Sequence, residues 1–211
     1  MMSVEGVLET AQKAVKAGAT RICLAAGWRE IKGNRPFEQI LKMVKGIKEM
    51  GVEVCCTLGM LKDYEAKKLA DAGLYAYNHN IDTSERFYPN IITTRKFKDR
   101  LDTLDAVENC SIGVCCGGII GMGETIEDRL LMLQTLCNRP RHPESVPINT
   151  LSRIPGTPLE GMKQVPSWEL IRLVAVARIV MPKAMVRLSS GRNQLSRAEQ
   201  ALCFLACANS I

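Results

Sequence analysis

The segment VEVCCTLGM, residues 52–60, decides the expected fold because it joins the end of a helical pattern to an apolar strand. Glycine is the residue best suited to the left-handed conformation after a helix, so Gly51 marks the end of that helix. The residues ahead of it repeat apolar side chains at helical spacing: Phe37, Ile40, Leu41, Val44 and Ile47. The apolar run that follows predicts a strand.

The same arrangement occurs twice more along the chain. AVKAG ends at residue 18 and LADAG at residue 73, and each precedes an apolar run. The other strand candidates are 20–26, 74–81, 112–120, 145–150, 184–189 and 208–211, and helical patterns lie near 95–109, 124–138, 167–180 and 195–207. Strands that alternate with helices indicate a parallel sheet with right-handed crossovers.

The bulk composition is that of a globular protein, with 46% apolar and 24% charged residues in a chain of 211. The net charge is +6, and the lysines and arginines are scattered among aspartates and glutamates. Because the positive charges are not clustered, a nucleic-acid or membrane partner is not expected. No apolar run is long enough for a membrane span, and residues 1–18 lack an apolar signal core.

The cysteine pattern indicates free thiols in a reducing, intracellular compartment. Nine cysteines are present, an odd number, and most lie in apolar segments. No C-x-x-C pair occurs, and His79 and His142 are the only histidines. A zinc knuckle, a thioredoxin-type redox site and a histidine-rich metal site are therefore not expected.

Along the predicted strands, apolar residues on one face alternate with polar residues and cysteines on the other face. Arg187 and Ser189 alternate with Val186 and Leu188. Neighbouring residues in a strand point to opposite faces, so each cysteine doublet presents one thiol to a shared site. A polar, cysteine-bearing inner face is typical of a barrel. The alternative is that Cys23, Cys55 and Cys115 are small buried hydrophobes.

Longer segments resemble biotin synthase, a radical S-adenosylmethionine enzyme. These segments are TRICLAAGW (20–28), EVCCTLGM (53–60), YNHNIDTS (77–84), NIITTRKFKDRLDTL (90–104), GGIIGMGET (117–125), ESVPIN (144–149), MPKAMVRLSSGR (181–192) and EQALCFLACANSI (199–211). The resemblance implies an α/β fold, a (β/α)8 TIM-type barrel of the radical SAM class. It also implies one partial barrel domain over residues 1–211, incomplete because the first strand and most of the last are missing.

The resemblance implies conversion of dethiobiotin to biotin by radical sulfur insertion, which makes the family a sulfurtransferase. A 4Fe–4S cluster reduces S-adenosylmethionine to give a radical, and a 2Fe–2S cluster supplies the sulfur. An inert C–H bond offers no acid, base or nucleophile a point of attack, so a cofactor-borne radical is needed. An aldolase-like barrel would need a lysine or a carboxylate pair on the inner face, and none is evident.

The family's site residues fall on matching positions of this sequence. The implied 2Fe–2S ligands are Cys23, Cys55, Cys115 and Arg187. The implied S-adenosylmethionine contacts are Asn80, Asp82, Arg100, Gly117 and Gly118, and the implied dethiobiotin contact is Asn149. Without the resemblance, Asn80 and Asp82 would be strand-end and turn caps, and Arg100 a helix-surface arginine.

The family's C-x-x-x-C-x-x-C loop, which holds the 4Fe–4S cluster, has no counterpart here. The segment C203-FLAC-207 with Ser210 fits part of that pattern, but it lies on a predicted helix where the family has no cluster. We therefore expect Cys203 and Cys207 to be core contacts, Cys116 and Cys207 to be packing substitutions, and the 4Fe–4S cluster only in a full-length protein.

Two functions of different class follow from this. The first is biotin synthase, with dethiobiotin, a reducing electron-transfer protein and a second copy in a homodimer as partners. The alternative is a catalytically inactive, truncated form that keeps the 2Fe–2S site. The expected compartment is the mitochondrial matrix in a eukaryote and otherwise the cytoplasm.

Overall fold

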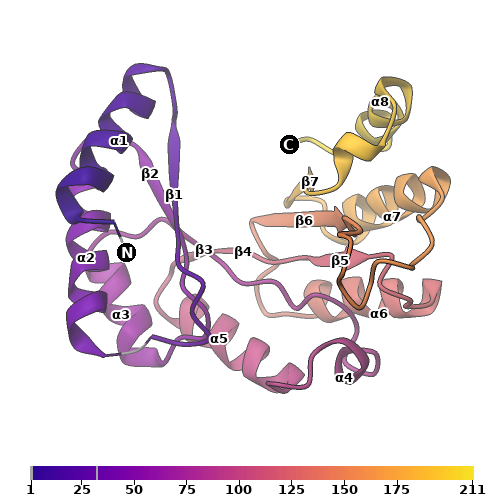
Figure 1. Cartoon of the computed structure of the whole chain (residues 1–211), viewed down its shortest axis with the longest axis horizontal. Coiled ribbons are helices and arrows are strands. Elements are labelled where there is room, and N and C mark those ends of the chain that lie inside the picture. Colours follow the sequence, from indigo (N-terminus) through magenta and orange to yellow (C-terminus); the bar gives the residue numbers. More distant parts are fainter. Residues whose placement is uncertain (1, 32) are drawn as a thin grey trace. The chain divides into compact units, whose positions relative to one another are not determined.

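The computed structural model describes residues 2–31 and 33–211, in which parallel strands alternate with helices (Figure 1). The chain divides into two compact units, Met1–His79 with Asp99–Val114, and Asn80–Lys98 with Cys115–Ile211. Among the described residues, no helix has both the length and the apolar character needed to cross a membrane.

The first unit is built on three parallel strands, β1 (Arg21–Ala25), β2 (Glu53–Thr57) and β3 (Ala76–Asn78). Its helices are α1 (Val4–Lys16), α2 (Asn34–Lys48), α3 (Asp63–Asp71) and α5 (Phe97–Asn109). Figure 1 shows α1, α2 and α3 along one side of β1 and β2. Helix α2 turns its apolar stripe inward, where Val44 and Ile47 are completely buried.

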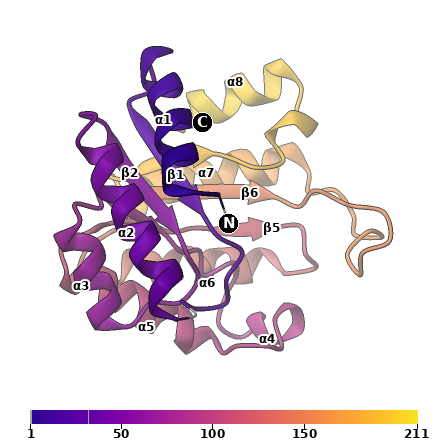
Figure 2. The same cartoon turned by 60° about the vertical axis from the view of Figure 1, so that its left-hand side comes forward.

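The second unit is arranged around β6 (Ser145–Thr150), which pairs in parallel with β5 (Gly118–Ile120) and β7 (Met185–Leu188). Strand β4 (Gly113–Cys115) spans the boundary, and its Cys115 also pairs with β6. Figure 2 shows β5 and β6 side by side. The helices are α4 (Tyr88–Ile91), α6 (Ile126–Cys137), α7 (Ser167–Val180), the 3-10 turn η1 (Arg192–Gln194) and α8 (Arg197–Leu205).

The glycine signals predicted from the sequence are confirmed. Gly18, Gly51 and Gly73 follow helices with φ of 92°, 80° and 90°. The four later helices lie where the periodicity predicted them, whereas α4 and η1 were not predicted because a single turn carries no periodic signal.

The prediction of one strand over 112–120 is wrong, because the segment forms β4 and β5. Both pair with β6 in one register, Cys115 with Ser145 and Gly118 with Ile148. The break falls at Gly117, opposite Pro147, which has no N–H to donate to the ladder. The strand predicted over 208–211 is reduced to one bridge, between Arg187 and Ser210.

Candidate functional site

Two of the expected cluster ligands are direct neighbours in the first unit. Cys23 of β1 lies opposite Cys55 of β2 in the register, while Leu24 lies opposite Cys56 on the other face. Cys55 is buried and Cys23 is exposed. Cys23 lines a groove of about 670 Å³ with mainly apolar walls, including Trp28. The alternative of a small buried hydrophobe is therefore wrong for Cys23.

The second cysteine of each doublet lies in the apolar core. Cys56 and Cys116 are completely buried. Burial raises the pKa of both thiols far above its ordinary value, since the thiolate would lose its hydration. A thiolate is the form that binds metal, so neither residue is suited to be a ligand. This agrees with the packing role expected for Cys116.

The other two expected ligands lie in the second unit, on one face of its sheet. Cys115 lies opposite Ser145, and Ser145 lies opposite Met185. Arg187 is two residues beyond Met185, so it faces the same side as Cys115. The half-buried Arg187 donates from Nε to Ser210 Oγ at 3.3 Å, and it makes no ion pair with a carboxylate in the described part of the chain.

Each unit therefore contributes two of the four expected ligands from a single sheet face. Three of these four residues are cysteines, and thiolates are the usual ligands of iron–sulfur clusters. Among residues 2–31 and 33–211, no three His, Cys, Asp or Glu side chains form a group that could hold a metal ion.

Three further expected site residues converge on the Gly117–Gly118 peptide in the second unit, which is itself part of the expected site. Asn80 accepts from the Gly117 N–H at its Oδ1, at 3.0 Å. Asn149 donates from Nδ2 to the Gly118 carbonyl oxygen, also at 3.0 Å. Asp82 donates its backbone N–H to the Gly117 carbonyl at 3.3 Å and forms a bridge with Gly118. The structure thus brings together Asn80, Asp82, Gly117, Gly118 and Asn149.

Close approach of the backbone explains why both central residues are glycine. A Cβ at Gly117 would lie 2.0 Å from the Pro147 carbonyl oxygen. A Cβ at Gly118 would lie 2.5 Å from the Asp82 carbonyl oxygen and 2.2 Å from the Met132 sulfur. No side chain fits either position without movement of the backbone.

The two asparagines use part of their hydrogen-bonding capacity on the backbone and keep part of it. Asn149 Oδ1 accepts from the Ser190 N–H at 3.0 Å, so this residue ties together the ends of three strands. The capping role considered for Asn80 accounts for its Oδ1, and its Nδ2 donates to no described residue. Each side chain therefore retains N–H donors for a ligand acceptor such as a hydroxyl or carbonyl oxygen.

The glycine-rich loop after β5 is fastened by a buried glutamate that the sequence did not single out. Glu124 accepts from the N–H groups of Gly121 and Met122, each at 2.7 Å. Its other neighbour is Arg129, whose Nε lies 2.7 Å from Glu124 Oε1 and which also pairs with Glu169. The loop is thereby fixed to α6 and α7.

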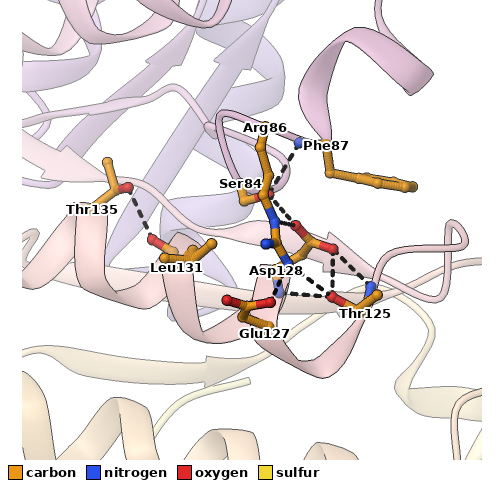
Figure 3. A network of polar contacts seen from close by, with 8 residues as sticks. All are labelled: Ser84, Arg86, Phe87, Thr125, Glu127, Asp128, Leu131 and Thr135. Carbon is orange, nitrogen blue, oxygen red and sulfur yellow. Dashed lines mark hydrogen bonds and ion pairs between the residues drawn. The ribbon is translucent and has the colours of Figure 1, made fainter.

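A second polar network joins α6 to the segment that carries Asp82 (Figure 3). The Asp128 carboxylate accepts from Ser84 Oγ at 2.7 Å and from Arg86 Nε at 2.6 Å. Thr125 and Asp128 also form the capping box of α6. The T-x-x-D spacing indicates that cap in the sequence, but nothing there pairs it with Ser84.

Arg100 and the C-terminal cysteines are carried by other elements. Arg100 is a half-buried residue of α5 in the first unit, whereas Asn80 and Asp82 belong to the second. Cys203 is buried, as expected. The expectation that Cys207 is a core contact is wrong, because it follows the end of α8, is exposed and has a φ of 74°.

Comparisons with known proteins agree with this architecture. Residues 1–136 match the model of the radical SAM superfamily, and residues 147–211 match the Biotin and Thiamin Synthesis associated domain. Among solved structures, methylornithine synthase superposes with a TM-score of 0.83 at 21% identity, covering 99% of this chain and 61% of its own. The FeFe-hydrogenase maturase HydG of Carboxydothermus hydrogenoformans gives 0.79 at 16% identity, covering 99% and 50%. These two show the fold, an α/β arrangement consistent with a partial TIM-type barrel.

Curated relatives match over the whole chain. Biotin synthase of Chlamydia abortus is 59% identical and that of Nostoc punctiforme 57%, each covering 100% of this chain. The mitochondrial biotin synthase of Arabidopsis thaliana is 58% identical with the same coverage. The chain spans 64%, 63% and 56% of the lengths of these three relatives. The chain therefore belongs to the radical SAM superfamily, in which it matches biotin synthases over its full length.

Proposed function

We propose that this chain provides the sulfur-donor site and the ligand contacts of a biotin synthase, which converts dethiobiotin to biotin. The observation that supports this best is the convergence of Asn80, Asp82 and Asn149 on one glycine pair. The remaining N–H donors of the two asparagines and the carboxylate of Asp82 are groups that suit the ribose hydroxyls of S-adenosylmethionine and the ureido group of dethiobiotin. Identity of 55–59% to biotin synthases supports the same assignment.

The chain's own residues have separate tasks in this proposal. Cys23, Cys55, Cys115 and Arg187 hold a 2Fe–2S cluster, which supplies sulfur when bound. Asn80 and Asp82 orient the nucleoside, and Arg100 binds the methionyl carboxylate, since a guanidinium matches a carboxylate with two parallel bonds.

The resemblance also sets the proposed partners. A 4Fe–4S cluster, held by a C-x-x-x-C-x-x-C loop of the full-length protein, and a reducing electron-transfer protein supply the radical chemistry. A second copy in a homodimer is the proposed assembly. The proposed compartment is the mitochondrial matrix in a eukaryote and the cytoplasm otherwise.

Anaerobic reconstitution with iron and sulfide tests the cluster site. We expect about two irons per chain, with the visible absorption of a 2Fe–2S centre. Cys55→Ala should abolish both signals because it removes a ligand. Cys56→Ala is the matched control from the same doublet, and it should keep the cluster while losing some stability to the cavity it leaves. Equal iron loss in the two variants would contradict the assignment.

Product analysis then separates full catalysis from cluster binding alone. Two proteins are reconstituted and compared, this chain and a longer protein in which a C-x-x-x-C-x-x-C loop precedes it. Each is mixed with S-adenosylmethionine, dethiobiotin and a reductant, and biotin is measured by mass spectrometry. Biotin formed by the longer protein supports this chain as the sulfur-donor and ligand-binding part of a synthase. Two irons per chain without biotin in either protein supports the alternative, a form that binds the cluster and does not turn over.

A further inference from the structure

We propose that Asp128, Ser84 and Arg86 form a positioning device, here called the Asp128 lock, that holds the turn at Asp82 in its ligand-binding conformation. The proposal deepens the proposed function, because Asp82 is the residue expected to bind the nucleoside ribose. None of the three residues of the lock was assigned a role by the sequence or by the resemblance.

The Asp128 carboxylate is a well-satisfied buried anion at the start of α6. Its side chain is 5% exposed. Besides Ser84 and Arg86 on Oδ1, it accepts at Oδ2 from the Thr125 N–H at 2.9 Å and from Thr125 Oγ1 at 2.6 Å. A negative charge is also favourable in the first turn of a helix. Asp128 is therefore a fixed anchor, and the segment that it binds is fixed with it.

Ser84 connects the Asp128 carboxylate to the chain segment that follows Asp82, and Figure 3 shows Ser84 and Phe87 beside Asp128. Its side chain is buried, and its hydroxyl donates to Asp128 and accepts from the Phe87 N–H at 3.2 Å. Its carbonyl accepts from the Tyr88 N–H at 2.9 Å. One serine thus connects α6 with the turn that leads into α4.

The Asp82 turn needs such support because its backbone is strained. Asp82 has a φ of 69°, in the left-handed region that residues with a Cβ atom rarely occupy. On one side it is held by Gly117, which accepts from Ile81 and Asp82, and by Ile119, which donates to the Asp82 carbonyl at 2.8 Å. On the other side, two residues along the chain, Ser84 is bonded to Asp128. The φ of Asp82 sets the direction of its Cα–Cβ bond, so by holding this turn the lock orients the Asp82 side chain.

Arg86 closes the lock from the solvent side. Its guanidinium is half-exposed and also bonds to Glu127, so it pairs with two carboxylates at the helix start. Exposed ion pairs contribute little, and the buried hydroxyl–carboxylate bond is therefore the part of the lock to remove in an experiment.

The test compares Ser84→Ala with Thr135→Val. Both changes delete a hydroxyl that donates to α6; Ser84→Ala also removes the acceptor of the Phe87 N–H, whereas in the described part of the chain the Thr135 hydroxyl bonds only to the Leu131 carbonyl of its own helix. Hydrogen exchange is measured at the amides of Ile81, Asp82 and Ile119 in the chain without ligand. We expect Ser84→Ala to accelerate exchange there by about tenfold and Thr135→Val to leave it unchanged, after correction for global stability.

Binding of S-adenosylhomocysteine, measured by calorimetry, completes the test. Ser84→Ala should weaken binding by about tenfold, and Thr135→Val should not. Equal exchange in the two variants, or faster exchange with unchanged binding, would overturn the proposal. If the unmodified chain binds no S-adenosylhomocysteine, the proposed nucleoside site fails, and the exchange result alone then decides whether the lock holds the Asp82 turn.

Discussion

At the scale of single residues, Cys207 has a backbone conformation that is unfavourable for its residue type. It follows α8 with a φ of 74°, and its carbonyl accepts two bonds from Arg178 that keep it in that conformation. Glycine adopts this conformation without steric cost, whereas cysteine does not. The periodicity that suggested a buried helical residue could not show that the helix ends at Leu205.

Cys207→Gly should therefore stabilise the chain, by about 1 kcal/mol in the free energy of unfolding. The control is Ala206→Gly, at a φ of −76°, which should destabilise because the unfolded chain gains freedom and no strain is released. Urea denaturation measures both. A lower urea midpoint for Cys207→Gly than for the unmodified chain would show that the left-handed backbone is not a source of strain.

At the scale of elements, the start of α6 couples helix capping to the candidate site. Bonds from Arg86 first, and then from Thr125 and Ser84, hold the pKa of Asp128 well below its ordinary value despite its burial. A carboxylate with a depressed folded-state pKa adds stability above its unfolded pKa, and this stability is lost as pH falls through the folded value.

The stability of the chain should consequently decrease as pH falls below about 4, the ordinary pKa of an aspartate. Asp128→Asn should reduce that dependence, since the unfolded state no longer takes up this proton. Urea midpoints between pH 3 and 6 measure the effect. Glu9→Gln, at an exposed residue that pairs with Lys13, is the control and should leave the slope nearly unchanged. Parallel slopes for Asp128→Asn and the unmodified chain would contradict the role given to Asp128.

At the scale of the whole molecule, the proposed cluster draws its ligands from both compact units. We expect Cys115→Ala in the second unit to abolish iron binding as fully as Cys55→Ala in the first, because a cluster needs its complete ligand set. Cys116→Ala, at the buried neighbour, should retain the iron. Iron and acid-labile sulfide analysis gives the comparison. Full iron retention in Cys115→Ala would restrict the metal site to the first unit.

The single domain expected over residues 1–211 stays a prediction. So do the roles of the individual site residues, because matching a family assigns a residue type to a position without demonstrating what it binds. What the structure adds is proximity within each unit: Cys23 beside Cys55, and Asn80 and Asn149 on the two ends of one glycine pair.

The sequence by itself determined the alternation of helices and strands, the glycine caps and the cysteine of each doublet that shares a sheet face with another expected ligand. These features depend on local periodicity and on backbone preferences, which neighbouring residues carry. Only the tertiary structure decided that the strand over 112–120 breaks opposite Pro147, that Asp128 binds Ser84, and that Cys207 leaves the core. Each of these depends on contacts between residues distant in the chain. The spacing of apolar and polar residues along the sequence does not reveal such contacts.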